Sequence, residues 1–222
     1  MSCEVTLAGE SLLARPSGAA FWPSRSILCV SDLHLGKSER LARRAGVLLP
    51  PYETRETLAR LDGELDATGA TSVICLGDSF DDAASLDGLD EGDRLWLLRL
   101  MAGRDWIWIS GNHDSGPLEI AGSHKAESRH GALTFRHIAD PAATAEVSGH
   151  FHPKARLAGT AWRCFLTDGV RLILPAFGTY TGGLWTHDPA LSDLMGPRSL
   201  AILCGRQSAR AIPMPRASTA SR

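Results

Sequence analysis

Three short apolar runs, each followed by polar residues, constrain the fold of this chain more than any other feature. The runs cover 26–32, 71–78 and 106–114, and their lengths are typical of buried strands. Between them, 52–69 has leucines at helical spacing, and 89–103 begins near Asp90, a candidate cap, and closes at a glycine. Alternation of strands and helices predicts parallel strands covered by helices.

The second half of the chain is predicted to be rich in strands, with little helix between them. Strand-like runs cover 132–138, 145–150, 169–176 and 199–205, and the N-terminal segment also reads as strands joined by turns. The whole pattern predicts an α/β sandwich with mixed sheets. We expect one domain over residues 1–205, followed by a basic, mobile C-terminal tail over 206–222.

Composition excludes several classes of protein. The chain has 222 residues, 44% hydrophobic and 22% charged, which is globular composition and not that of a disordered or fibrous chain. No apolar run approaches the roughly 18 residues that a membrane span needs, and acidic residues stand where a signal peptide would be apolar. We therefore expect a cytoplasmic protein without membrane association. The five cysteines have no Cys-x-x-Cys spacing, so neither a disulfide framework nor a thiolate zinc site is predicted.

Charge is unevenly distributed, although the formal net charge is only −2. Acidic residues are concentrated in the first two thirds of the chain. After Asp193, every charged residue is an arginine (Arg198, Arg206, Arg210, Arg216 and Arg222). A basic end can attract a polyanion such as nucleic acid, and a tail kept in solution by its charge explains the pattern equally well.

Side chains able to bind metal follow the early strands and recur later in the chain. They are Asp32, His34, Asp78, Asn112, His113, His150 and His152. Ligands of open α/β sheets bind outside the carboxyl ends of the strands, where residues distant in sequence converge. Each short motif alone is a weak signal, but the ordered set DxH, GD, GNHD, GHxH predicts a binuclear metal centre. Oxygen and imidazole ligands without thiolate suit manganese, iron or zinc.

The ordered set resembles the calcineurin-like metallophosphoesterase superfamily. The resemblance implies a four-layer αββα sandwich with two mixed sheets and the metals at one edge. It also implies a ligand set in which Asp78 bridges the two ions. The first metal would be held by Asp32, His34, Asp78 and His152, and the second by Asp78, Asn112, His150 and one further histidine.

The further histidine has three candidates. His137 follows apolar residues in strand-like alternation and precedes the GHxH block, as the family pattern requires. His124 and His130 fall in a polar stretch that reads as a loop, and His187 reads as a surface residue. We therefore predict that His137 is the missing ligand.

The resemblance also implies the chemistry. Two divalent ions, Mn²⁺ foremost with Fe or Zn as alternatives, would lie across the phosphate oxygens and activate a bridging water. By resemblance, His113 protonates the leaving oxygen. Asp114 is expected to favour the imidazolium form of His113 and to fix its orientation.

Three longer stretches refine the resemblance. Residues 41–61, 148–157 and 175–184 resemble the ligase-associated DNA-damage-response endonucleases, a bacterial group linked to an ATP-dependent DNA ligase and a helicase. DNA is then the expected substrate, with those two proteins as partners. Asp81 and Gly36 stand where we expect relatives often to carry His and Glu. One rival hypothesis is the same chemistry on a nucleotide or other small phosphoester. A second is a non-catalytic scaffold, which the presence of the full ligand set argues against.

Basic residues near the metal blocks are candidates for binding substrate phosphates. They are Lys37, Arg43 and Arg44 after the first block and Lys154 after the last, with Tyr180 as a residue that could stack on a base. The acidic run over 81–93 opposes a long duplex there, and we read it as a solvated surface. The glycine-rich stretch 175–184 suits either close approach to a ligand or a structural turn. The sequence leaves the oligomeric state open.

Overall fold

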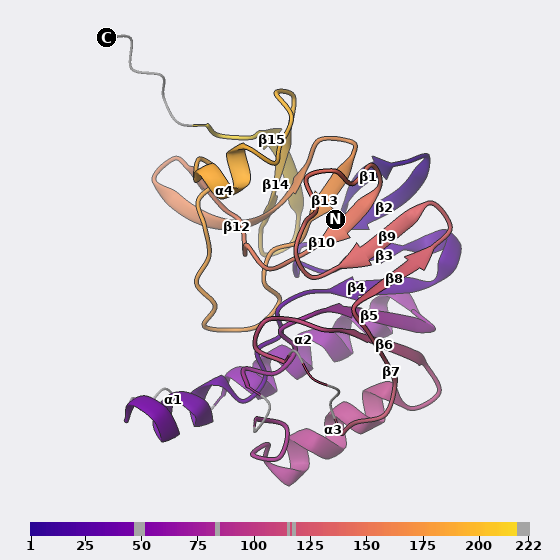
Figure 1. Ribbon diagram of the computed structural model, residues 1–222, viewed down its shortest axis with the longest axis vertical. Helices are drawn as coiled ribbons and strands as arrows, with labels where there is room; N and C mark the ends of the chain where they lie inside the picture. The colour runs from indigo at the N-terminus through magenta and orange to yellow at the C-terminus, as the bar shows by residue number, and fades with distance from the viewer. Residues whose placement is uncertain (47–51, 83–84, 115, 117–118, 217–222) are drawn as a thin grey trace.

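Two mixed β-sheets form the body of the protein in a computed structural model that describes residues 1–46, 52–82, 85–114, 116 and 119–216. They lie face to face, with the main helices below the first sheet in the view of Figure 1. The first sheet has the order β1 to β7, antiparallel from β1 to β4 and parallel from β4 to β7. Its strands are β1 (Cys3–Leu7), β2 (Glu10–Ala14), β3 (Ala20–Trp22), β4 (Ile27–Val30), β5 (Ser72–Leu76), β6 (Asp105–Ile109) and β7 (Ser123–Lys125).

The second sheet has the order β15-β14-β12-β13-β10-β9-β8, and β11 pairs with β12 beside that path. β9, β10 and β13 are parallel, and the pairings of β12 with its neighbours are antiparallel. Its strands are β8 (Glu127–His130), β9 (Leu133–Arg136), β10 (Glu146–Ser148), β11 (Lys154–Leu157), β12 (Thr160–Thr167), β13 (Arg171–Ile173), β14 (Leu200–Cys204) and β15 (Ala209–Pro213).

The hydrophobic core lies on both faces of the first sheet. Between the sheets, Trp22 and Leu76 pack in one cluster with Phe135 of the second sheet, because alternate strand residues point to that face. On the other face lie α2 (Glu53–Thr68) and α3 (Glu91–Met101), which bury leucines that include Leu58 and Leu97. The α/β sandwich with two mixed sheets is therefore confirmed.

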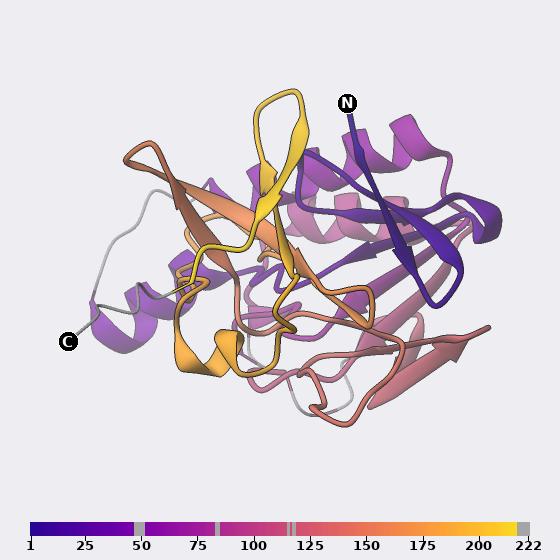
Figure 2. The ribbon, with the colours of Figure 1, turned by 90° about the horizontal axis from the view of Figure 1, so that it is seen from above.

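The outer layer on the second sheet is thinner than the four-layer prediction. In the described part of the chain, the helix in that layer is the short α4 (Pro189–Ser192), whose Leu191 packs in a third cluster with residues of β12, β13 and β14. Two smaller elements complete the helices, the 3₁₀ turn η1 (Pro23–Arg25) and α1 (Lys37–Ala45). In Figures 1 and 2, α1 and the β11–β12 hairpin project from the same side of the molecule.

Both long helices form where the sequence predicts them. Asp90 caps α3 by accepting a hydrogen bond from the backbone N–H of Gly92 at 3.0 Å. α2 ends at Gly69, which takes the left-handed conformation that glycine adopts without strain. No helix in the described ranges is long and apolar enough to cross a membrane.

The polar stretch around His124 and His130, which was predicted to be a loop, forms strands β7 and β8 instead. Both strands are short and lie at the edges of their sheets, so few of their side chains are buried and the apolar alternation typical of strands is missing. Hydrogen bonds from one neighbouring strand hold each of them in place. The pairing is set by tertiary contacts that a single-sequence pattern does not record.

The predicted boundary after Gly205 and the mobile tail are wrong for residues 209–216. β15 pairs with β14 along its whole length, Met214 is buried, and the Arg216 side chain donates hydrogen bonds to the carbonyl oxygens of Met195 and Gly196. Pro213 is compatible with this strand because β15 is an edge strand. Residues 217–222 lie outside the described residues.

The docking of this segment can be tested by Met214→Ala. Because Met214 is only 6% exposed and packs in the third cluster, we expect the free energy of unfolding to fall by about 2 kcal/mol or more. Urea denaturation would measure the change. Leu200→Ala is the matched control, since Leu200 in the paired strand is 40% exposed and should change stability much less. Equal effects of the two substitutions would contradict the docking.

Candidate metal centre

Six side chains from the ends of strands in both sheets gather at one edge of the sandwich. They form two groups, Asp32 with His34 and His152, and Asp78 with His137 and His150, and in each group the candidate ligand atoms lie within 4.8 Å of one another. Asp32 and Asp78 follow the parallel strands β4 and β5, whereas His137 and His150 follow β9 and β10. The sequence predicted all six residues, and the structure brings them together; their binding of metal stays a prediction.

The backbone at this edge is held in the left-handed conformation, which residues other than glycine rarely adopt. Positive φ angles between 47° and 70° occur at five of the six residues: Asp32, His34, Asp78, His150 and His152. A left-handed residue other than glycine costs of the order of 1–3 kcal/mol and is typical of functional sites. The turns place successive side chains toward one point directly after each strand ends.

The first group has three ligand atoms without hydrogen-bond partners. Asp32 Oδ1, His34 Nε2 and His152 Nε2 are all buried and unsatisfied among the described residues. Asp32 Oδ1 lies 3.0 Å from His152 Nε2, and the rings of His34 and His152 meet edge to face with centroids 5.4 Å apart. Buried polar atoms without partners are costly, so their convergence fits a bound cation.

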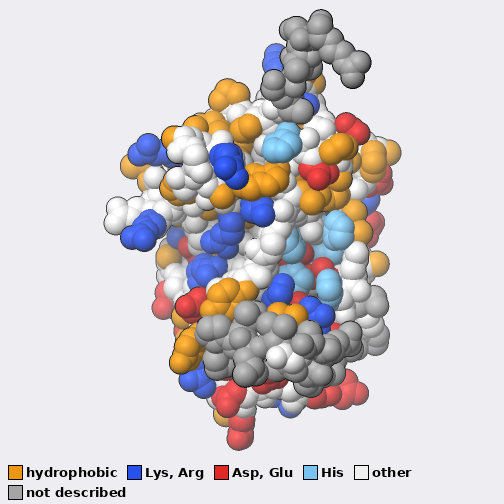
Figure 3. Space-filling model, turned by 90° about the vertical axis from the view of Figure 1, so that its left-hand side faces the viewer, with side chains coloured by type: hydrophobic (Ala, Val, Ile, Leu, Met, Phe, Trp, Pro, Cys, Tyr) orange, Lys and Arg blue, Asp and Glu red, His pale blue; other side chains and the backbone are white. Residues whose placement is uncertain are grey.

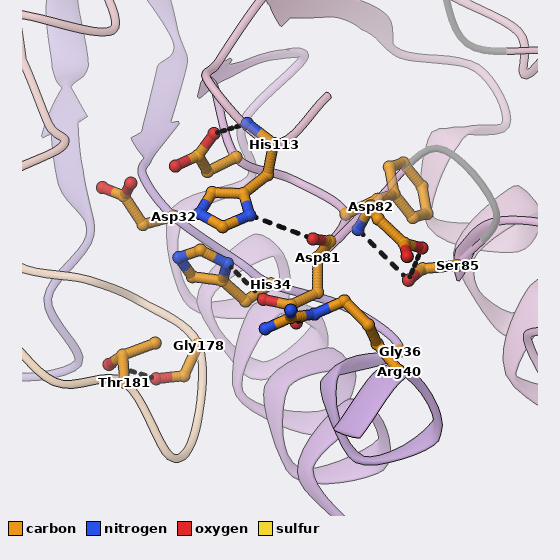
Figure 4. A network of polar contacts seen from close by, with 12 residues as sticks. Asp32, His34, Gly36, Arg40, Asp81, Asp82, Ser85, His113, Gly178 and Thr181 are labelled. Atoms are coloured by element: carbon orange, nitrogen blue, oxygen red, sulfur yellow. Dashed lines mark hydrogen bonds and ion pairs between the residues drawn. The ribbon is translucent and has the colours of Figure 1, made fainter. Parts of the chain in front are cut away.

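The other nitrogen of His34 contacts a residue that sequence reasoning did not assign to the site. His34 Nδ1 lies 2.9 Å from a carboxylate oxygen of Asp81, whose second oxygen accepts a hydrogen bond from Arg40 (Figure 4). A carboxylate oxygen only accepts, so His34 Nδ1 is the donor in this contact, and Nε2 is the nitrogen that faces the group. This carboxylate–histidine pair is the usual partner arrangement of a metal-binding imidazole. The adjacent acids of the GDSFDD segment were the only sequence signal for it.

The second group has a similar arrangement. His137 Nδ1 donates to the carbonyl oxygen of Leu76 at 2.7 Å, which leaves Nε2 facing the group. That Nε2 lies 3.4 Å from Asp78 Oδ2 and 3.2 Å from His150 Nδ1. His124 and His130 contact Ile120 and Ser128 instead, so His137 is the one of the three candidates that lies with the predicted ligands.

The electrostatics of the centre keep its carboxylates ionised. Burial alone would raise the pKa of Asp32 and Asp78, but close contact with the imidazoles of His152 and His137, respectively, holds both values below the ordinary range. Burial opposes the charged form of His137 too, yet contact with Asp78 and Asp32 raises its pKa. Burial, followed by the charge of His137, lowers the pKa of His150. Carboxylates and imidazoles are thus crowded at a point where a divalent ion would stabilise the ionised carboxylates and the neutral imidazoles.

The residues fit a pair of divalent cations. Two groups of three, each with one carboxylate and two imidazoles, present oxygen and nitrogen atoms without thiolate, a donor set that suits manganese, iron or zinc. The unsatisfied atoms of the first group give the fit its physical basis. The identity of the metal does not follow from the geometry.

The GNHD block contributes its residues in different ways. Asn112 is exposed, and its ligation of a metal stays a prediction. His113 is also exposed, and its backbone N–H donates to Asp78 Oδ1 at 2.8 Å, while its Nδ1 contacts the carbonyl oxygen of Asp81 at 3.1 Å. Its ring therefore lies beside that of His34, at a centroid distance of 5.3 Å (Figure 4).

The expected role of Asp114 is not what the structure shows. Its carboxylate is buried and accepts hydrogen bonds from the backbone N–H groups of four residues: Asp78, Ser79, Phe80 and Gly111. No described contact joins it to the His113 imidazole. Asp114 instead fixes the turn after β5 against the turn after β6, because its oxygens satisfy N–H groups that the strands leave unpaired.

Three of the five candidate substrate-binding side chains, those of Lys37, Lys154 and Tyr180, are described by the structure. Lys37 begins α1, as predicted, and the side chains of Arg43 and Arg44 in that helix lie outside the described residues. Lys154 begins β11, two residues after His152. Tyr180 is 45% exposed. Figure 3 shows Lys and Arg side chains in a row beside several histidines on one face of the molecule.

The acidic run is only partly a solvated surface. Asp81, Asp82 and Asp93 are buried, the first against His34 and Arg40, and the other two against Ser85 and Arg55 respectively. Burial would raise the pKa of Asp81, but His34 and Arg40 lower it to about 2. The prediction of a solvated run is wrong for these three residues, because charge alone does not reveal a partner distant in sequence.

The backbone of the glycine-rich stretch packs against residues of the candidate metal centre. The backbone N–H of Gly178 donates to the carbonyl oxygen of Asp32 at 3.0 Å, and a Cβ atom added at Gly178 would lie 2.1 Å from the carbonyl oxygen of Leu33. A Cβ atom at Gly183 would lie 2.0 Å from the carbonyl oxygen of His152. Of the two alternatives for this stretch, the described contacts support a structural role, since its backbone packs directly on residues of the centre.

Comparison with known proteins identifies the family. The family model described as calcineurin-like phosphoesterase matches residues 25–201, so the chain belongs to that family. Among solved structures it is similar to a crystal structure of Pseudomonas putida nuclease MPE. The sequences are 26% identical, the match covers 96% of this chain and 100% of the other, and the TM-score is 0.75. No curated protein matches the chain.

The contact between Asp81 and His34 predicts a measurable effect on metal binding. Asp81→Ala removes the acceptor that orients His34, so affinity for Mn²⁺ should fall by about 10–100-fold. Asp81→Asn retains an acceptor and should recover part of the loss. Isothermal titration calorimetry would measure both variants. Asp87→Ala removes an exposed acid of the same run and serves as the matched control; an equal loss in that variant would reduce the effect to one of overall charge.

Proposed function

We propose that the protein is a two-metal phosphodiesterase that cleaves DNA, with Mn²⁺ as the metal. The observation that carries the proposal is the pair of carboxylate–imidazole groups at one edge of a calcineurin-like phosphoesterase fold. The similarity to a nuclease over nearly the whole chain supports a nucleic acid as the substrate. The sequence resemblance alone suggests endonuclease action in DNA repair with a ligase and a helicase.

The groups around the two sites have separate tasks in the proposed reaction. When bound, two divalent ions supply charge neutralisation of the phosphate and an activated water as nucleophile. Asp32 and Asp78 provide the negative charge that holds cations in this buried edge. Asp81 and the carbonyl oxygen of Leu76 hold one nitrogen of His34 and of His137, so that the opposite nitrogen faces the sites.

His113 is the candidate general acid. Because a carbonyl oxygen only accepts hydrogen bonds, contact with the carbonyl of Asp81 assigns a proton to His113 Nδ1 and leaves Nε2 to exchange one with the leaving oxygen. Its backbone contact with Asp78 ties the ring to the second group. Its exposure gives a substrate access to that nitrogen.

The alternative substrate is a nucleotide or another small phosphoester. Single-stranded DNA, duplex DNA and bis-p-nitrophenyl phosphate, each incubated with the protein and Mn²⁺, separate the two proposals. We expect cleavage of DNA as well as of the small diester, because the chain has basic side chains beside the histidines on one face (Figure 3). Hydrolysis of the small diester without cleavage of either DNA would overturn the nuclease proposal.

The role of His113 is tested by His113→Ala. Since the imidazole would supply the proton to the leaving oxygen, turnover of DNA should fall by about 10² or more. Loss should be smaller for bis-p-nitrophenyl phosphate, whose leaving group needs little protonation. Calorimetry with Mn²⁺ should give binding close to that of the unmodified protein. An unchanged rate on DNA would remove His113 from this role.

A further inference from the structure

A basic cavity lies beside the glycine-rich stretch, since two of its lining residues, Arg60 and Arg163, donate to the carbonyl oxygens of Phe177 and Ala176. Its volume is about 600 Å³. It is lined by the N-terminus, α2, β12 and the turn between β14 and β15, among them Arg15, Arg60, Arg163 and Arg206. The proposed function, as stated so far, does not involve this cavity.

The charges that line the cavity are mostly of one sign. Four arginines and the N-terminal amino group face a single acid, Glu64. That acid is already paired, because Arg15 Nε lies 2.6 Å from its carboxylate. Arg206 is exposed and has no partner among the described residues. Glu64 thus offsets Arg15, and Glu56, one turn before Arg60 in α2, partly offsets Arg60. Arg163 and Arg206 keep positive charge without an ion pair to a described carboxylate.

The two inner arginines are held by backbone carbonyl oxygens. Arg60 donates to the carbonyl of Phe177, and Arg163 donates to that of Ala176 at 2.9 Å. Burial, and then the charge of Arg163, lowers the pKa of Arg60. The indole Nε1 of Trp162, another lining residue, is buried without a hydrogen-bond acceptor among the described residues. Fixed donors and a net excess of positive charge are what an anionic ligand requires.

The cavity is connected to the metal centre through β11 and β12. Lys154, two residues after His152, lies directly opposite Arg163 in the antiparallel pair. Like charges in that position repel each other, and a polyanion across the pair would relieve the repulsion. Lys154 and Arg156 also lie over the ring of Trp185, each 5.0 Å from its centroid. Basic side chains thus continue from the metal ligand His152 to the cavity.

We propose that Lys154 and the cavity of Arg60, Arg163 and Arg206 bind the phosphates of the nucleic-acid strand on one side of the scissile bond. The inference rests on the proposed nuclease function and adds to it a direction in which the strand leaves the metal centre. Bis-p-nitrophenyl phosphate has a single phosphate, so it cannot occupy the metal centre and the cavity at once. Its hydrolysis therefore provides a measure of the metal centre that is independent of strand binding.

Binding of a labelled single-stranded oligonucleotide tests the proposal without catalysis. The oligonucleotide is about 16 nucleotides long, the upper end of common site sizes, and its anisotropy is measured in EDTA over a series of salt concentrations. Arg206→Ala should weaken binding about fivefold at 0.1 M salt and reduce the salt slope by about 0.7, as expected for one lost phosphate contact. Lys154→Ala combined with Arg206→Ala should roughly double the change in slope.

Arg129→Ala is the matched control, because Arg129 is an exposed arginine on β8 that does not line the cavity. It should leave binding unchanged. Equal binding by the unmodified protein and Arg206→Ala, or an equal loss in Arg129→Ala, would overturn the inference. A third outcome would also overturn it: inorganic phosphate stabilises the protein in a manner that depends on Arg206, but oligonucleotide binding does not depend on Arg206. The cavity would then be a site for a small anion. Failure of the nuclease proposal has a different signature, since the unmodified protein would then cleave bis-p-nitrophenyl phosphate and no DNA.

Discussion

The carboxylate of Asp32 is the contact on which the arrangement of the site depends. One oxygen accepts hydrogen bonds from the Ser31 hydroxyl and from the backbone N–H of His150 at 3.0 Å, so it joins the end of β4 to the end of β10 in the other sheet. Its backbone carbonyl accepts from Gly178. Its second oxygen points toward His152. A buried aspartate whose carboxylate and backbone carbonyl accept from Ser31, His150 and Gly178 fixes the relative positions of three segments. The low dielectric makes each hydrogen bond stronger than it would be in water.

Asp114 fixes two turns of the first sheet relative to each other, as Asp32 fixes the ends of strands in the two sheets. Four backbone N–H groups from the turns after β5 and β6 converge on its oxygens. These turns carry Asp78 and His113, so a residue that contacts only the backbone of a candidate ligand, that of Asp78, still sets where the two side chains lie. The left-handed conformations of Asp32 and Asp78 are maintained because such networks stabilise the turns around them.

Much of the site was predictable because its chemistry follows local strand patterns. An apolar run followed by a polar residue places that residue at a sheet edge, which is how Asp32, His34 and Asp78 were found. His137 was chosen by alternation along its strand, and it lies with the ligands. Asp81 was not found, because its partners His34 and Arg40 are distant in sequence and a buried acid looks like a surface acid until the fold is known. The same reason explains the error over β15, whose pairing with β14 depends on an edge that only the folded sheet provides.

The sequence by itself determined the strand and helix order of the first half, the motif residues and the family, because these are written in short-range periodicity and spacing. Tertiary structure alone decided which atoms remain unsatisfied, where Asp114 directs its oxygens, and that Arg60 and Arg163 line one cavity with Arg206. The unsatisfied atoms of His34 and His152 and the arginines Arg60 and Arg163 are more than a hundred positions apart, and Asp114 accepts from residues up to 36 positions away. Close packing and hydrogen bonding in three dimensions bring these residues together. No local pattern in the chain carries that information.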